Sequence, residues 1–110
     1  MPHVLLEWQF TSASAKAMME RPHDRSALAR TLVESFGGKL HQYFFAFGDC
    51  DGIGIAEFPD RISALAFSMK AGSTGAFSRF ETRPLFTPKE AEEAMKKARD
   101  TKTDYRPPNV

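Results

Sequence analysis

Hydrophobic and polar residues alternate along four short stretches of the chain, and this alternation predicts four β-strands. The first stretch, HVLLEWQF at residues 3–10, places an apolar set on one face of a strand: Val4, Leu6, Trp8 and Phe10. Comparable stretches predict strands at 39–47, 52–58 and 77–86. Since successive strand residues point to opposite sides, each stretch offers one face to a core and one to another environment.

Apolar residues at helical spacing predict helices between these strands. Residues 14–36 read as one helical stretch that is interrupted near Pro22, which cannot donate the hydrogen bond of a helix interior. Its second half carries the stripe Leu28, Leu32, Val33 and Phe36. Pro59 and Asp60 precede another helix, whose predicted buried stripe is Ile62, Leu65, Ala66 and Met69.

A last helix begins at Thr87, where Thr-Pro-Lys-Glu has the residues of a capping box with proline at the first helical position. We expect its inner stripe to be Ala91, Ala94, Met95 and Ala98, and residues 101–110 to form an extended tail. The order strand, helix, strand, strand, helix, strand predicts an α+β protein. The simplest packing is a ferredoxin-like four-stranded antiparallel sheet with an added C-terminal helix, in a single domain over residues 1–110.

The hairpin around Gly48-Asp49-Cys50-Asp51 is apolar on both faces. One face would carry Tyr43, Phe45, Phe47, Gly52, Gly54 and Ala56, and the other Leu40, Phe44, Ala46, Ile53 and Ile55. We expect the two isoleucines to meet the helices, which leaves the aromatic face in need of a cover. That cover is a second copy of the chain or a small apolar ligand in the space above the glycines, and the two can coexist.

Composition narrows the classes of function. The chain has 15 basic and 14 acidic residues, so it lacks the basic excess typical of nucleic-acid binding. No apolar run reaches the roughly 20 residues that span a bilayer, and the N-terminus lacks the pattern of a signal peptide. The single cysteine, Cys50, forms no internal disulfide, and no histidine pair has helical metal-site spacing. We therefore expect a cytoplasmic protein without membrane or nucleic-acid partners, metal or cofactor.

Several side chains are candidates for chemistry. His41 is expected to share a strand face with Tyr43 and Phe45, where it would act as a base, or else to lie at a solvated sheet edge. Asp51 would be an acid or base beside the apolar space, although aspartates in a tight turn also bond nearby backbone amides. Glu7 would pair across strands with Arg79 or Arg83, or else that pair would point into the apolar space and suit an anionic substrate.

An ordered set of features resembles the GYD domain family. Trp8 ends the first strand, Gly37-Gly38-Lys39-Leu40 opens the second, and Gly48-x-x-Asp51 forms the turn. Glu57-x-Pro59-Asp60 and Thr82-x-Pro-Leu-Phe86-Thr87 follow in order, and Pro22 and Arg25 lie in the first helical region. The resemblance covers residues 3 to about 98. It implies a ferredoxin-like fold of the dimeric α/β-barrel type, but no general reaction, and Cys50 replaces the tyrosine of the family name.

Two hypotheses follow. In the first, a homodimer or higher oligomer binds a small, partly apolar molecule between walls formed by Trp8, Tyr43, Phe45 and Phe47, with Gly54 leaving room. If it is an enzyme, His41 or Asp51 would serve metal-free proton transfer or oxygen insertion. In the second, the protein is a structural or regulatory module whose aromatic face only holds subunits together.

Overall fold

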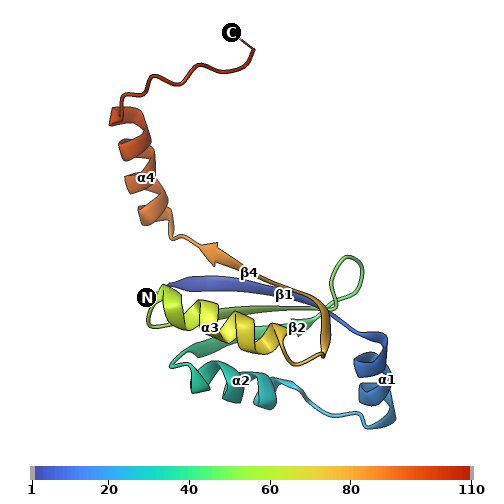
Figure 1. Cartoon of the computed structure of the whole chain (residues 1–110). Coiled ribbons are helices and arrows are strands. Elements are labelled where there is room, and N and C mark those ends of the chain that lie inside the picture. The colour runs from blue at the N-terminus through green and yellow to red at the C-terminus, as the bar shows by residue number, and fades with distance from the viewer. Residues whose placement is uncertain (1, 110) are drawn as a thin grey trace.

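The computed structural model describes residues 2–109, which form four strands and four helices (Figure 1). In chain order the elements are β1 (His3–Phe10), α1 (Ser12–Glu20), α2 (Ser26–Ser35), β2 (Lys39–Phe45), β3 (Gly52–Glu57), α3 (Arg61–Gly72), β4 (Phe77–Leu85) and α4 (Pro88–Asp100). The helical stretch around Pro22 is thus two separate helices. Residues 101–109 contain no helix or strand. No helix within residues 2–109 is long and apolar enough to cross a membrane.

The four strands form one antiparallel sheet in the order β2-β3-β1-β4. β1 and β3 lie in the centre, and the β2–β3 hairpin pairs with β1 through β3. This is the strand order of a ferredoxin-like α+β fold, and it confirms the predicted fold class. Because α2 and α3 connect strands that are not neighbours, both cross the sheet on the same side (Figure 1).

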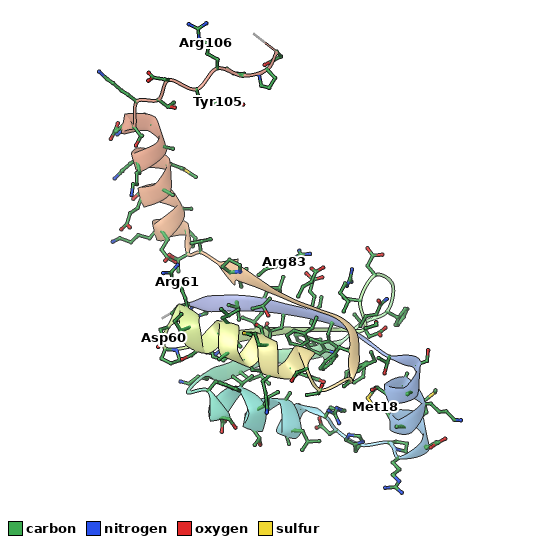
Figure 2. All side chains as sticks on the ribbon, viewed as in Figure 1. Met18, Asp60, Arg61, Arg83, Tyr105 and Arg106 are labelled. Carbon is green, nitrogen blue, oxygen red and sulfur yellow. The ribbon has the colours of Figure 1, made fainter. Side chains whose placement is uncertain are left out.

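The core lies between the sheet and these two helices. Its buried members come from β1, β2, β3, the residue that follows β3, and helices α2 and α3: Val4, Leu6, Trp8, Val33, Leu40, Ala56, Phe58, Ala64 and Phe67. We call the other side of the sheet the open face, because neither α2 nor α3 covers it. Figure 2 shows Arg83 on this open side, away from both helices.

The predicted orientation of the β2–β3 hairpin was wrong, although Tyr43 and Phe45 do share a face with Gly52 and Gly54. Tyr43 and Phe45 lie on the helix side of the sheet, opposite Gly54 and Gly52, whereas Ile53 and Ile55 lie on the open face. The reason is the volume of Trp8, whose indole lies directly over Gly52. A tryptophan in the core requires glycine as its neighbour on β3, so the glycine side must face the helices.

A β-bulge in β2 changes the face of one further residue. Leu40 pairs with Ala56 and Gln42 with Ile55, so His41 is the extra residue between two successive pairs. A bulge of this kind re-aims a side chain. His41 therefore lies on the open face and not beside Tyr43 and Phe45, as the plain alternation predicted. The hairpin register also differs from the expected one, because Phe45 and not Phe47 pairs with Gly52, and the Ala46 N–H donates to the Asp51 carbonyl at 2.9 Å.

Helix α3 begins where Asp60 predicts, with the Asp60 side chain accepting from the Ser63 N–H at 2.7 Å. Figure 2 labels Asp60 at this end of the helix. Its buried stripe, however, is Ala64, Phe67 and Ala71, and the predicted stripe around Ile62, Leu65 and Met69 is exposed. Both stripes have helical spacing. The observed one presents alanines to the sheet, which lets the helix approach closely.

Helix α4 has the predicted start. The Thr87 side chain accepts from the Glu90 N–H, and the Glu90 carboxylate accepts from the Thr87 N–H at 2.8 Å. The helix then projects away from the sheet (Figure 1), and none of its residues is buried. The predicted inner stripe, which includes Met95, is therefore not covered by any part of the chain between residues 2 and 109.

Candidate functional site

A cavity of about 190 Å³ lies between the helix side of the sheet and helices α2 and α3. Its walls are mainly apolar and aromatic, which is typical of small-molecule sites. They are formed by Leu6, Trp8, Phe10, Arg25, Leu28, Ala29, Leu32, Val33, Leu40, Tyr43, Phe67, Ala71, Thr74, Ala76, Phe77 and Phe80. A second hollow of about 280 Å³ adjoins it toward α1, beside Met18, and shares Phe10, Arg25 and Ala76 (Figure 2).

Trp8 is the largest wall of this cavity. Its side chain is only 4% exposed, and its ring lies 5.2 Å from the ring of Tyr43 and 6.2 Å from that of Phe80 between centroids. The indole N–H is buried and has no hydrogen-bond acceptor within residues 2–109. Buried donors normally have a partner, but this one lies against Gly52 and is closed off from the cavity.

The polar groups at the cavity are Arg25, Tyr43 and Thr74. Burial raises the pKa of the Tyr43 phenol, and the Arg25 guanidinium opposes this shift by favouring the phenolate. Arg25 is itself oriented by His23, whose Nε2 lies 3.2 Å from the guanidinium Nη1. The cavity therefore combines apolar walls with a neutral phenol and a cation, which suits a ligand that has one acceptor or anionic group.

The volume limits the size of such a ligand. An apolar cavity of about 150 Å³ accommodates a benzene-sized molecule, whereas sites for drug-sized ligands start at roughly 300 Å³. A cavity of 190 Å³ corresponds to one ring with a short substituent. The adjoining hollow is the direction in which a longer substituent would extend.

The ligand-binding residues expected from the sequence divide into two groups. Trp8 and Tyr43 line the cavity, and Phe45 lies beside it, with its ring 5.9 Å from that of Tyr43. Gly54 lies beneath the indole, where an added Cβ would come within 3.6 Å of it. Phe47 is apart from the others, because it lies in the hairpin loop and is 98% exposed.

Asp51 occupies a structural position. Its Oδ2 accepts from the Phe10 N–H at 2.9 Å, and its own N–H donates to the Trp8 carbonyl at 2.8 Å. The register of β1 against β4 shifts between Gln9 and Phe10, which leaves the Phe10 N–H free to bond a side chain. Asp51 thus ties the hairpin loop to the end of β1. Cys50, next to it, is buried.

His41 belongs to a different cluster, on the open face. Its Nε2 lies 3.0 Å from Glu57 Oε1, and the Nε2 of His3 lies 3.7 Å from the same oxygen. The hydrogen bond from His41 lowers the pKa of the Glu57 carboxyl, and the charges of His3 and His41 act in the same direction. Since the sheet separates this cluster from the cavity, His41 and Tyr43 do not belong to one site.

An ion-pair row crosses the same open face. Glu7 of β1 pairs with Arg83 of β4 at 3.2 Å, and Arg83 also pairs with Glu81 at 2.9 Å. This confirms the expected cross-strand pairing of Glu7 and assigns it to Arg83. The pairs are partly exposed, and exposed pairs of this kind contribute little to stability.

Most wall residues were not predicted from the sequence as site residues, among them two phenylalanines of β4. Phe77 and Phe80 of β4 pack against Trp8 on the cavity side. The alternation of Phe80 with Arg79 and Glu81 would have placed it on an inner face. Arg25 had no signal beyond its place in the family pattern, because its role depends on how α1 and α2 meet the sheet.

Comparison with known proteins gives one assignment. No curated protein and no solved structure matches the chain significantly. The model of the GYD domain family matches residues 5–95. This range contains all four strands, apart from the first residues of β1, and it also contains most of α4. By this match over most of its length, the protein belongs to the GYD domain family.

Proposed function

We propose that this protein binds a small molecule of about one ring in the cavity between its sheet and helices. The observation that carries the proposal is an apolar cavity lined by aromatic rings, with a neutral phenol and a guanidinium in its wall. A carboxylate or similar anion would pair with Arg25. The ligand class is therefore a single-ring compound with a short anionic group.

Binding is better supported than acid–base catalysis. Within residues 2–109 no carboxylate and no imidazole lines the cavity. The only proton donor or acceptor of suitable reactivity is the Tyr43 phenol, whose raised pKa keeps it neutral at physiological pH. Cofactor-free enzymatic activity at this site would depend on Tyr43, with Arg25 to stabilise a developing negative charge.

The test uses Trp8, the only tryptophan, as a fluorescence reporter inside the cavity. Benzoate and its neutral analogue toluene are titrated against the wild type, Arg25→Ala and Arg30→Ala. Arg30 is exposed on α2, whose N-cap residue is Arg25, and does not line the cavity, so it is the matched control. We expect benzoate to quench Trp8 and raise the melting temperature, and Arg25→Ala to remove its advantage over toluene. Absence of both effects in the wild type would refute the site for this ligand class.

Native mass spectrometry of the freshly purified protein is the unbiased form of the same test. We expect an oligomer with added mass in the range of a single-ring compound, and the denatured sample should lose that mass. An oligomer without added mass would favour the second hypothesis, a structural or regulatory module that serves only self-association.

We further infer that the protein self-associates through its open face. Phe44 is 60% exposed there, next to Ile53, Ile55 and Leu5 on neighbouring positions of β3 and β1. An apolar centre with a charged rim, here Glu7 and its partners, is the usual anatomy of an interface. A second copy of the same face would cover the centre, as the sheet stacking of dimeric α/β-barrel proteins does.

Phe44→Ser and Phe47→Ser form a matched pair for this inference. Both phenylalanines are exposed, but only Phe44 lies on the open face. Burying a phenylalanine contributes about 1.5–3 kcal/mol, so two partly buried copies give roughly 2–4 kcal/mol, or 30- to 1000-fold in the dimer dissociation constant. Light scattering over a dilution series should show weaker association for Phe44→Ser alone. A wild type that remains monomeric at high concentration would contradict the inference.

A further inference from the structure

We propose that His3, His41 and Glu57 form a binding site for a divalent transition-metal ion, zinc in particular. One ligand atom from each residue lies within 4.8 Å of the other two. Both Nε2 atoms approach the same carboxylate oxygen, at 3.0 and 3.7 Å. In a tetrahedral zinc site with bonds of about 2.0–2.2 Å, ligand atoms lie roughly 3.3–3.6 Å from one another. Small side-chain rotations therefore suffice to place all three around one ion.

The fold brings these residues together from three different strands. β3 lies between β1 and β2, so His3 and His41 approach Glu57 from opposite sides. His3 is the direct partner of Glu57 in the β1–β3 register. His41 is the extra residue of the bulge between Leu40 and Gln42, and its side chain lies on the same side of the sheet as Glu57.

The two imidazoles are already arranged as a pair. Their ring centroids are 5.7 Å apart with an interplanar angle of 13°, so the rings lie nearly parallel with both Nε2 atoms at Glu57. A single carboxylate requires only one histidine as an ion-pair partner. Here two parallel rings direct the same nitrogen atom, Nε2, at one carboxylate oxygen. A metal ion bound by all three side chains explains this arrangement better than an ion pair does.

The donor set selects the class of metal. Two imidazole nitrogens and one carboxylate oxygen suit zinc and its first-row neighbours, whereas calcium and magnesium prefer oxygen ligands throughout. Three protein ligands also leave one coordination position open, as in catalytic zinc sites. The side chains of His3 and His41 are 42% and 36% exposed, so solvent reaches the cluster. A water molecule or an anionic group would complete the coordination.

Zinc binding to the untagged protein tests the site, with isothermal titration calorimetry and competition against a chromogenic chelator as readouts. The variants are His3→Ala, His41→Ala and Glu57→Gln, and His23→Ala is the control. His23 is exposed, lies next to α2 and bonds to the Arg21 carbonyl at 2.8 Å, away from the cluster. Far-ultraviolet circular dichroism checks that each variant is folded.

We expect one zinc ion per chain and no change in affinity for His23→Ala. Each cluster variant should bind at least about 100-fold more weakly, since loss of a supporting residue alone costs 10- to 100-fold. Cobalt should bind at the same site and give the visible absorption of a tetrahedral ion, which the cluster variants abolish. Equal affinity of the wild type and His41→Ala would overturn the proposal and leave a simple ion pair. Because the cavity lies on the other side of the sheet, this result is independent of benzoate binding.

Discussion

Replacement of Gly52 by alanine is the sharpest test of how Trp8 is positioned. A Cβ built on Gly52 overlaps the five- and six-membered rings of the indole, whereas a Cβ on Gly54 meets its nearest atom, the Gln42 carbonyl oxygen, at 3.3 Å. The indole cannot simply move aside, because Tyr43, Phe77 and Phe80 surround its other side. Gly52→Ala must therefore push the ring toward the cavity or strain the strand pairing.

The magnitude follows from two opposing effects. Overpacking a close-packed core costs about 1–3 kcal/mol, while replacing glycine with alanine in a compatible backbone contributes about 0.4–1 kcal/mol of stability through the unfolded state. Gly52 has no left-handed backbone angle, so that gain applies. We expect a net loss of about 1–2 kcal/mol in the free energy of unfolding, or roughly 4–15 °C in melting temperature. Gly54→Ala should change stability by less than about 1 kcal/mol, because its new contacts are close to ordinary van der Waals distances.

Chemical denaturation gives the stability difference, and Trp8 emission reports the position of the ring. Gly52→Ala should shift the emission of the folded protein and weaken benzoate binding, since the displaced ring takes up cavity volume. Gly54→Ala serves as the control for loss of a strand glycine. A Gly52→Ala variant with wild-type stability and emission would show that the indole does not lie over Gly52, and the description of the cavity wall would then be wrong.

Two further predictions concern Tyr43 in the cavity wall and Asp51 at the end of β1. In Tyr105→Phe the remaining tyrosine is Tyr43, and its phenolate absorbance should appear above the ordinary pKa of about 10, because burial disfavours the charged form. The stability that depends on a neutral Tyr43 is complete below that pH and is lost as the pH rises through the pKa of Tyr43 in the folded protein. Arg25→Ala should raise this pKa further. Asp51→Ala should cost about 1–3 kcal/mol of unfolding free energy, since the Phe10 N–H loses its acceptor, while Asp51→Asn retains an oxygen and should cost less. Equal losses for the two Asp51 variants would indicate that charge matters more than the hydrogen bond.

The sequence was sufficient to predict the elements and their order, because local signals determine them. Pro22 separates two helices, Asp60 caps one and the Thr87 box starts another, and each acts within a few residues. Antiparallel pairing and the ferredoxin-like order then follow from short connections and right-handed crossovers. These features do not depend on which side chains face the core.

Which face of each strand meets the helices could not be predicted in the same way. It depends on the volumes of side chains on neighbouring strands, and the local pattern of hydrophobic and polar residues does not contain this information. Both sides of β3 are apolar, so alternation alone cannot decide whether Ile53 or Gly52 meets the helices. The decision comes from Trp8 on the neighbouring strand, which fits only above a glycine. The bulge at His41 is a second case. One inserted residue reverses the phase of the alternation, and a count from either end of β2 gives a different face.

The alternating residues of β3 connect the two proposed sites. Toward the helices β3 presents Gly52, Gly54 and Ala56, whose small size leaves the volume that Trp8 and the cavity occupy. Toward the open face it presents Ile53, Ile55 and Glu57, which provide an apolar surface and the carboxylate of the histidine cluster. A shift of one residue in the β3 register would exchange these sets and remove both sites at once. Substitutions confined to one side, such as Gly52→Ala or Glu57→Gln, should instead affect ligand binding or zinc binding separately, and this separation distinguishes two independent sites from one.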